Sequence, residues 1–209
     1  MSVILRDISK RYGDKRVLEN LCLTFTFGKR YAVVGTSGIG KTTLLRLIAG
    51  LEMPDDGSVE MQNDPVISYA FQEPRLFPGL TVMENIRAIE PERDGSQLLE
   101  MLDLLHESDH YPASLSGGMK KRAGLARALS KKADIYLIDE PTAGQDANHS
   151  AAVADAIRAY TAGSLCIIST HDAELIAAIA EEMIVFSNKG VALHRVAGKT
   201  TDEIRCLMQ

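Results

Sequence analysis

The sequence predicts an α/β fold with a mainly parallel β-sheet, an N-terminal antiparallel β part and an inserted helical subdomain. Strand-like and helix-like patterns alternate along most of the chain, which is typical of a parallel sheet covered by helices. Two continuous apolar runs, residues 31–34 and 135–138, indicate strands buried on both faces. Residues 21–27 instead alternate apolar and polar side chains, as a half-buried strand in an antiparallel sheet requires.

The other elements follow from local signals. A helix over residues 44–49 should end before Gly50, because glycine is favoured just past a helix end. The last helix should start at residue 201, since Thr200 and Glu203 form a capping-box pattern. Between these we expect short strands at 59–61 and 66–70, helices at 117–130, 151–160 and 172–181, a strand at 165–169, and a hairpin of 183–187 and 191–196 that turns at 188–190.

The segment from residue 72 to about 111 has a different pattern. Its leucines recur at helical spacing, and prolines divide it into short pieces. The apolar residues that carry this pattern are Leu98, Leu99, Met101, Leu102 and Leu105. We interpret the segment as an inserted helical subdomain.

The composition describes an ordinary globular surface. Hydrophobic residues make up 45% of the 209 residues and the formal net charge is −5, which argues against nucleic acid as a partner. Apolar stretches such as 173–180 are too short to span a membrane, and residues 1–6 lack the pattern of a secretion signal. The three cysteines, Cys22, Cys166 and Cys206, lack metal-ligand spacing, so we expect reduced thiols.

Residues 35–42 match the pattern G-x-x-x-x-G-K-[ST] between a predicted buried strand and a predicted helix. Glycines let backbone N–H groups approach phosphate oxygens, and the helix N-terminus favours negative charge. Lys41 would neutralise the β- and γ-phosphates, and the Thr42 hydroxyl would bind Mg²⁺. The residues predicted to bind a nucleoside triphosphate here are Gly35, Thr36, Ser37, Gly38, Ile39, Gly40, Lys41, Thr42 and Thr43.

Two further segments should reach the same edge of the sheet. Asp139 and Glu140 close an apolar strand, where Asp139 could hold hydrated Mg²⁺ and Glu140 could polarise an attacking water. His171 follows the strand 165–169 and could donate a hydrogen bond to a γ-phosphate. The alternative for His171 is a helix-capping histidine or a surface histidine whose hydrogen bonds are satisfied.

A second surface suited to phosphate lies far from the first in the sequence. Ser116, Gly117 and Gly118 form a turn that opens the predicted helix 117–130. Two such surfaces on one chain suggest that a nucleotide is held between two copies.

Together these motifs resemble the nucleotide-binding subunits of ATP-binding-cassette (ABC) transporters. The resemblance covers essentially the whole chain and depends on the order of its motifs: phosphate loop, Gln72, Leu-Ser-Gly-Gly-x at 115–119, Ile-Tyr-Leu-Ile-Asp-Glu at 135–140, Asp146 and His171. It implies a single ATPase domain over residues 1–209. The core and its antiparallel part would come from 1–71 and 113–209, and the helical subdomain from about 72–130.

The resemblance also implies roles for individual residues. Tyr12 would stack on adenine, although it could equally be an ordinary loop tyrosine. Gln72 would touch both Mg²⁺ and the attacking water. Ser116, Gly117 and Gly118 would cover the γ-phosphate of ATP bound to a partner subunit. Glu140 would be the catalytic base, with His171, Gln72 and Lys41 completing the catalytic set, while Asp146 would lie on the loop that crosses between the two sites.

As a family member, the chain would dimerise with itself or with a second ABC ATPase around two ATP–Mg²⁺. Integral membrane permease subunits would dock between Gln72 and Asn85, where Leu76, Phe77 and Leu80 could form an apolar groove or belong to the subdomain core. The location implied is cytoplasmic, on the inner face of the cell membrane, and the complex could include an extracytoplasmic solute-binding protein.

The loop around Gln72 and the Met119 variant of the signature resemble importers for nitrate, sulfonates, taurine and pyrimidine precursors. The resemblance therefore favours import of a small organic anion. The alternatives are an export or lipoprotein-release system, and a soluble ABC ATPase outside transport. No heptad run suggests the coiled-coil insertion of repair members, and one cassette argues against translation members, which usually carry two.

Overall fold

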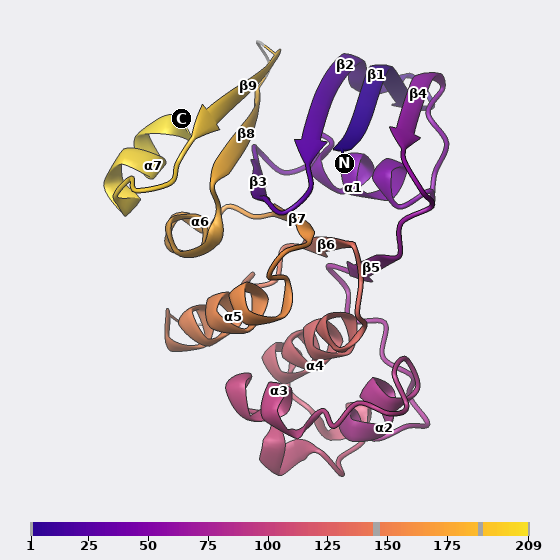
Figure 1. The fold of residues 1–209 in the computed structure, drawn as a ribbon, viewed down its shortest axis with the longest axis vertical. Helices are drawn as coiled ribbons and strands as arrows, with labels where there is room; N and C mark the ends of the chain where they lie inside the picture. Colours follow the sequence, from indigo (N-terminus) through magenta and orange to yellow (C-terminus); the bar gives the residue numbers. More distant parts are fainter. Residues whose placement is uncertain (1, 144–146, 188–189, 209) are drawn as a thin grey trace.

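The chain folds around two β-sheets in a computed structural model that describes residues 2–143, 147–187 and 190–208 (Figure 1). Strands β3, β5, β6, β7 and β8 of the central sheet run parallel to one another, and β9 runs antiparallel to β8. The predicted α/β class is confirmed. In spatial order the central strands are β5 (Ile67–Ala70), β6 (Ile135–Asp139), β7 (Leu165–Ser169), β3 (Arg30–Val34), β8 (Glu182–Ser187) and β9 (Gly190–Arg195).

The continuous apolar runs are buried on both faces of the central sheet, as predicted. In β6, Ile135 and Leu137 point into a core shared with the N-terminal sheet. Tyr136 and Ile138 point into the opposite core, which is shared with the helical part of the chain. Because every residue of β6 is buried, its sequence shows no alternation.

The N-terminal sheet is antiparallel, with the strand order β2 (Lys15–Thr26), β1 (Ser2–Tyr12) and β4 (Asp56–Met61). In β2 the predicted alternation is confirmed, since Leu21 and Phe25 are buried whereas Cys22 is exposed.

Strand β1 was not predicted, because its apolar pattern breaks off in the middle. Val3, Leu5 and Ile8 are all buried, so the spacing changes from two residues to three. Between Leu5 and Ile8 the pairing with β2 shifts register, and Asp7 has a φ of 50°. Such an irregularity returns the next apolar side chain to the core face, and it hides the strand from a search for strict alternation.

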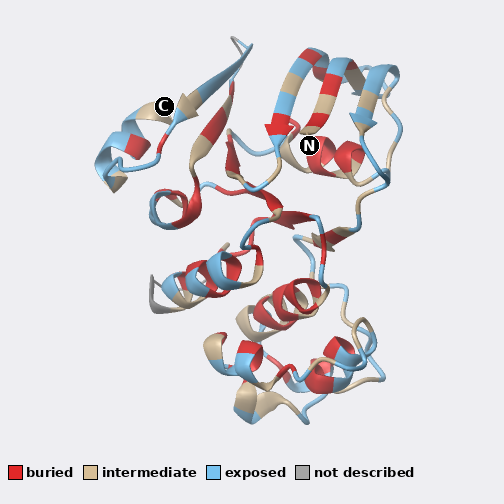
Figure 2. Ribbon diagram, in the orientation of Figure 1, coloured by how far each residue is buried: buried red, intermediate tan, exposed pale blue. Residues whose placement is uncertain are grey.

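Helices cover both faces of the central sheet. Figure 2 shows that α4 and α5 bury the sides that face the sheet, whereas β9 and α7 are largely exposed. The helices are α1 (Lys41–Ile48), α2 (Val82–Arg87), α3 (Ser96–Met101), α4 (Gly117–Ser130), α5 (Ala147–Tyr160), α6 (Ala173–Ile179) and α7 (Thr201–Leu207), with 3-10 turns at Leu105–Glu107 and Pro112–Ser114.

Several predicted boundaries are confirmed and others are wrong. Strand β2 begins at Lys15 rather than at residue 21, β4 begins at Asp56 rather than at residue 59, and α1 begins at Lys41 rather than at residue 44. Helix α7 carries the predicted capping box of Thr200 and Glu203. Helix α5 begins at Ala147 rather than at residue 151. Helix α6 ends at Ile179 rather than near residue 181, because Ala180 already has extended backbone geometry.

The segment predicted as a helical subdomain does contain short helices packed on α4 (Figure 1). Leu98, Leu99 and Leu102 are fully buried there, in agreement with their helical spacing. Helix α3 ends before Leu105, which lies in a separate 3-10 turn, since Asp103 takes a φ of 52°.

Asn85 organises the loop that precedes α2. Its side chain is 1% exposed and accepts a hydrogen bond from the Phe77 N–H at 2.7 Å. Its amide nitrogen donates to the carbonyls of Phe77, Leu80 and Thr81 at 2.9–3.1 Å. One buried side chain therefore shapes the turn that presents Phe77.

Helix α4 connects this loop to the central sheet. It packs on β5 and β6 and also on α2 and α3. Near its end, the Arg127 guanidinium donates to the Arg75 carbonyl and lies 5.3 Å from the Phe77 ring centroid. The segment after β5 is thus attached to α4 by hydrogen bonding and by a cation–π contact.

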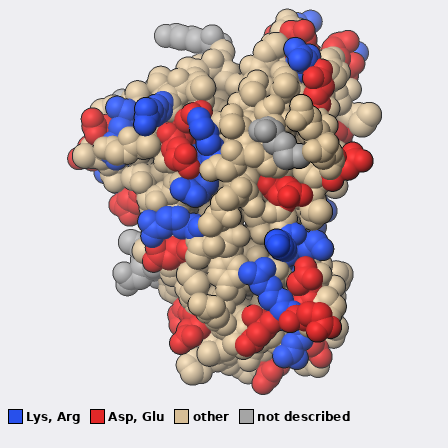
Figure 3. Space-filling model, viewed as in Figure 1, with Lys and Arg blue, Asp and Glu red and all other residues tan. Residues whose placement is uncertain are grey.

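Charges of both signs are interspersed over the face shown in Figure 3. Within the described ranges, no helix is both long and apolar enough to cross a bilayer.

The three cysteines should differ sharply in reactivity. Cys22 and Cys206 are exposed, whereas Cys166 is 0% exposed within β7. Burial raises the pKa of the Cys166 thiol to about 12, so its reactive thiolate is scarce in mildly alkaline buffer. We expect a disulfide reagent to modify two thiols in the native protein and the third only after denaturant is added. Rapid modification of all three in native buffer would contradict the buried position of Cys166.

Candidate nucleotide-binding site

A pocket of about 600 Å³ lies where β3, β6 and β7 end, at the edge of the sheet that the sequence predicts. Five separate segments of the chain meet there. The predicted residues that line it are Tyr12, Gly35, Thr36, Ser37, Gly38, Gly40, Lys41, Thr42, Thr43, Gln72, Glu140 and His171. Lys15, Val17 and Ala143 also line it without having been predicted. For Lys15 and Val17, the sequence signal that could have placed them in the pocket was their position just after Tyr12.

The phosphate loop needs glycine at its two ends. Gly40 has a φ of 118°, and a Cβ there would lie 2.9 Å from a Leu18 methyl carbon. Gly35 has a φ of 149°, and a Cβ there would lie 2.7 Å from the Phe186 carbonyl oxygen. These glycines let the chain turn sharply into α1, whose N-terminal N–H groups then face the pocket.

Lys41 is held by the loop itself. Its ammonium group donates to the Gly35 carbonyl at 2.7 Å and to the Thr36 carbonyl at 3.4 Å. It also lies 3.7 Å from a Glu140 carboxylate oxygen, and both side chains are about 10% exposed. A compact cation beside the N-terminus of α1 suits a polyphosphate.

The acidic pair at the end of β6 is held by Ser169, which sequence reasoning missed. The Ser169 hydroxyl donates to the Asp139 carboxylate. The Glu140 N–H donates to the Ser169 carbonyl at 2.9 Å and lies 3.1 Å from its hydroxyl oxygen. The available signal was a lone hydroxyl at the end of an otherwise apolar strand.

Glu140 leaves the strand in a left-handed conformation, with a φ of 49°. A non-glycine residue rarely adopts this geometry, and it is common at functional sites. The turn separates the two acids, because Asp139 is 3% exposed and does not line the pocket whereas Glu140 does.

His171 lies beside Glu140. Its Nδ1 is 2.9 Å from a Glu140 carboxylate oxygen, and its side chain is 69% exposed. The alternative of a helix-capping histidine is wrong, because the side chain of Asp172 accepts from the N–H groups of Glu174 and Leu175 at the start of α6. One ring nitrogen of His171 thus meets Glu140, and the ring remains accessible from solvent.

Tyr12 lies at the rim of the pocket with 46% of its surface exposed. Its hydroxyl donates to the Glu52 carboxylate. Partial burial raises the pKa of the Tyr12 hydroxyl, and the bond to Glu52 raises it further, so the ring stays neutral. A neutral ring fixed by its hydroxyl suits stacking on a flat base.

Gln72 follows β5 next to a stack of side chains. The rings of Tyr69 and Phe71 stack with centroids 4.3 Å apart. On the Phe71 ring lies the Arg75 guanidinium, 4.2 Å from the centroid. These contacts fix the backbone on both sides of Gln72.

The oxygen donors of Thr42, Gln72 and Asp139 are of the kind that Mg²⁺ prefers. In the described part of the chain, no group of three His, Cys, Asp or Glu side chains is placed to hold a metal by itself. Where Mg²⁺ accompanies a nucleotide, phosphate oxygens are usually among its ligands.

Like Asp139, the predicted residue Ile39 does not line this pocket. Ile39 instead lines a neighbouring cavity, where its side chain is apolar packing. Asp146 lies outside the described residues.

The second predicted phosphate surface is also separate, because residues 115–119 do not line the pocket. Ser116 caps α4 by accepting a bond from the Met119 N–H at 3.2 Å. A Cβ on Gly117 would meet nothing within 4 Å, and neither Gly117 nor Gly118 has a positive φ. The chain's own packing therefore does not explain glycine at Gly117, in a helix where it is unfavourable. Met119, in contrast, packs on the core beneath α4.

A family model described as ABC transporter matches residues 18–143, which is more than half of the chain. The chain belongs to this family. It is an ABC ATPase that binds ATP, and the predicted family resemblance is confirmed.

Known ABC proteins align with nearly the whole chain. An aliphatic sulfonates import ATP-binding protein, SsuB of Albidiferax ferrireducens, is 36% identical over 91% of this chain and 73% of its own. A probable sulfate/thiosulfate import ATP-binding protein, CysA of Chlorella vulgaris, is 33% identical over 90% of this chain and 88% of its own. The solved dimer of the ATP-binding cassette MJ0796 with ADP and Pi has a TM-score of 0.81 and 26% identity, covering 94% and 99% of the two chains.

Proposed function

We propose that this ABC ATPase drives an importer for a small oxyanion by hydrolysing ATP between two copies. The observation that supports the proposal is that the turn at Ser116 lies apart from the pocket that holds Lys41 within one chain. Ser116 and Gly117 are exposed at the start of α4, where a Cβ on Gly117 would meet nothing. A phosphate brought by another subunit can approach that open backbone closely.

Each site would combine the phosphate loop of one copy with Ser116, Gly117 and Gly118 of the other. Lys41 would neutralise the β- and γ-phosphates, and Tyr12 would stack on the base. The residues proposed to hold the phosphates are Gly35, Thr36, Ser37, Gly38, Gly40, Thr42 and Thr43. The MJ0796 cassette, which is dimeric with ADP and Pi, supports this arrangement.

Glu140 would accept a proton from the attacking water, which Gln72 would help to orient. His171 would donate to the γ-phosphate while its other ring nitrogen meets Glu140, in agreement with their 2.9 Å separation. Phosphoryl transfer to water requires little covalent participation by the protein. Catalysis would therefore depend on positioning the attacking water and the γ-phosphate and on stabilising the charge of the transition state.

Thr42, Gln72 and Asp139 would hold Mg²⁺ together with the phosphates. The ion would supply positive charge against the charge that develops in the transition state. Ser169 would keep the Asp139 carboxylate oriented through its hydroxyl.

A permease would dock on the loop between Gln72 and Asn85. Phe77 is 46% exposed there, and Leu76 packs on the core beneath it. The buried amide of Asn85 preorganises this loop, which lowers the entropic cost of binding. This placement would put the protein on the cytoplasmic face of the membrane.

A small oxyanion is the proposed cargo because the similar proteins SsuB and CysA are import ATP-binding proteins for aliphatic sulfonates and for sulfate or thiosulfate. The cargo would be delivered by an extracytoplasmic solute-binding protein and would not touch this chain. The link between ATPase and cargo is therefore an association, and it rests on which permease the chain binds.

The test is purification of the tagged protein from membranes of its source. We expect an integral membrane protein to co-purify in a stoichiometric amount with the wild type and with the control Val66→Asp. Phe77→Asp should release it, because a carboxylate would be buried in an apolar contact. Phe77 and Val66 are matched, with exposed fractions of 46% and 45%. Absence of any membrane protein from the wild-type preparation would contradict the transport function.

A further inference from the structure

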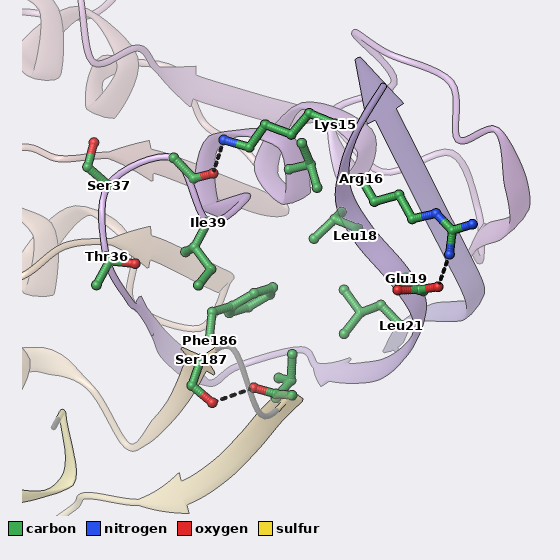
Figure 4. Close-up of a pocket in the computed structure, with 14 residues that line it drawn as sticks. Lys15, Arg16, Leu18, Glu19, Leu21, Thr36, Ser37, Ile39, Phe186 and Ser187 are labelled. Carbon is green, nitrogen blue, oxygen red and sulfur yellow. Dashed lines mark hydrogen bonds and ion pairs between the residues drawn. The ribbon is translucent and has the colours of Figure 1, made fainter. Parts of the chain in front are cut away.

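A second cavity, here called the β2–β8 pocket, lies beside the phosphate loop (Figure 4). It has a volume of about 480 Å³ and is enclosed by β2, residues 36–39, the end of β8 and the start of β9. The roles proposed for the nucleotide site leave this space unused. Its volume falls within the range of small-molecule sites.

One side of the β2–β8 pocket is apolar, although polar atoms make up the larger part of its exposed lining. Figure 4 shows Leu18 and Leu21 of β2 pointing toward Ile39 and Phe186 across the space. Val191 closes the side formed by β9. Leu18, Leu21 and Phe186 are only 5–6% exposed, so each presents a small apolar surface to the space. An apolar group placed against this side would gain van der Waals contacts.

The charged lining of the pocket is positive on balance. Arg16 and Glu19 form an ion pair with each other, so their charges offset. Lys15 donates to the Gly38 carbonyl at 3.3 Å, and this contact leaves its charge uncompensated. Among the described lining residues there are two cations and one anion, a balance of one positive charge.

We infer that the β2–β8 pocket binds a monoanion with an apolar body, namely an alkyl or aryl carboxylate or sulfonate. The apolar body would lie against Leu21, Ile39 and Phe186. The anionic group would lie at the end of the pocket where Lys15 and Arg16 reach solvent. In this arrangement the anionic group would pair with the positive charge of Lys15, so no ionised group would be buried without a partner.

The pocket and the nucleotide site share a wall. Lys15, Val17, Thr36, Ser37 and Gly38 line both. A ligand behind these residues would support the phosphate loop in the conformation that presents its N–H groups. Since coupling between two sites is reciprocal, the anion and ATP should each bind more tightly in the presence of the other. This coupling, unlike the binding itself, rests on the proposed nucleotide site.

The first experiment measures binding in the full chain without nucleotide. The probe is 8-anilino-1-naphthalenesulfonate, an aryl sulfonate that fluoresces in apolar surroundings, and octanoate is the competitor. Val191→Glu places a negative charge at the pocket wall and should weaken binding at least about tenfold, in line with repulsion of a few kT. Leu193→Glu is the matched control, because Val191 and Leu193 lie on the same face of β9 but only Val191 lines the pocket.

We expect saturable probe binding to the wild type and to Leu193→Glu, with displacement by octanoate. Equal affinities in the two variants would overturn the assignment, as would a lack of saturable binding to the wild type. Failure of the wild type to bind ATP would instead contradict the proposed nucleotide site and leave this measurement valid.

The second experiment measures the affinity for a fluorescent ATP analogue with and without octanoate. We expect octanoate to tighten binding about fivefold or more in the wild type and in Leu193→Glu, a modest value for coupled sites. Val191→Glu should bind the analogue as the wild type does but show no response to octanoate. An unchanged or weakened affinity in the wild type would overturn the coupling.

Discussion

Replacing Glu140 with Gln should lower the ATP hydrolysis rate by about 10²–10⁴-fold, the usual loss when a general base is removed. ATP affinity should be kept or increased, because the carboxylate that lies 3.7 Å from the Lys41 ammonium loses its charge. With hydrolysis blocked, the two copies should stay together on ATP. Turnover assays report the first effect, and light scattering with ATP and Mg²⁺ reports the dimer.

The control for this variant is Glu100→Gln, which makes the same change at an exposed position on α3. It should hydrolyse ATP at the wild-type rate and should not accumulate as a dimer. Wild-type turnover in Glu140→Gln would contradict the assignment of Glu140 as the base. Loss of ATP binding in that variant would show that the carboxylate is needed to hold the site together.

Ser116→Arg should lower hydrolysis by about 10²–10³-fold, comparable with the loss of one donor to a developing anion. The new side chain would fill the open space above Gly117 that the partner's phosphate is proposed to occupy. Binding of ATP to the monomer should be unchanged, because residues 115–119 do not line the pocket that holds Lys41. Equilibrium binding and turnover, measured on one preparation, separate the two effects.

The control is Ser58→Arg, at an exposed serine on β4. It should bind and hydrolyse ATP as the wild type does. An active Ser116→Arg would contradict a site shared between copies. A folding defect would be visible as weaker ATP binding, since the phosphate loop packs on the same core as β2 and α1.

The central sheet was the most predictable part of the fold. Strand β7 and helix α4 have the predicted bounds, because continuous burial and a strong cap leave clear local signals. Strand β1 was missed, since its register shift near Asp7 depends on pairing with β2 and breaks the alternation. The start of α5 was placed too late, because its first turn carries little apolar pattern.

The part of the site that follows from the common edge of parallel strands was predictable. Parallel strands end at a common edge, so Lys41, Glu140 and His171 were expected to meet, and they do. Ser169 was missed because its role depends on the contact between neighbouring strands, which one strand's sequence does not reveal. Ile39 shares the loop with the residues proposed to hold the phosphates, but its side chain packs in the neighbouring cavity, a distinction that a sequence motif cannot make. The roles assigned to these residues stay predictions.

Helix α4 connects the turn at Ser116 with the loop that holds Phe77. It is 14 residues long, so it spans about 21 Å from the open turn at Ser116 to the buried Ser130. Arg127 on the same helix donates a hydrogen bond to the Arg75 carbonyl and makes a cation–π contact with Phe77. Both residues belong to the loop proposed to face the permease. If ATP bound to a neighbouring subunit displaced the N-terminus of α4, the displacement would therefore be transmitted along the helix to the loop that holds Phe77. No flexible segment interrupts α4 between these two points. The size of the movement that reaches the transporter would then depend on the rigid-body movement of α4. Substitutions that destabilise the middle of α4 should therefore uncouple ATP hydrolysis from transport before they slow hydrolysis itself.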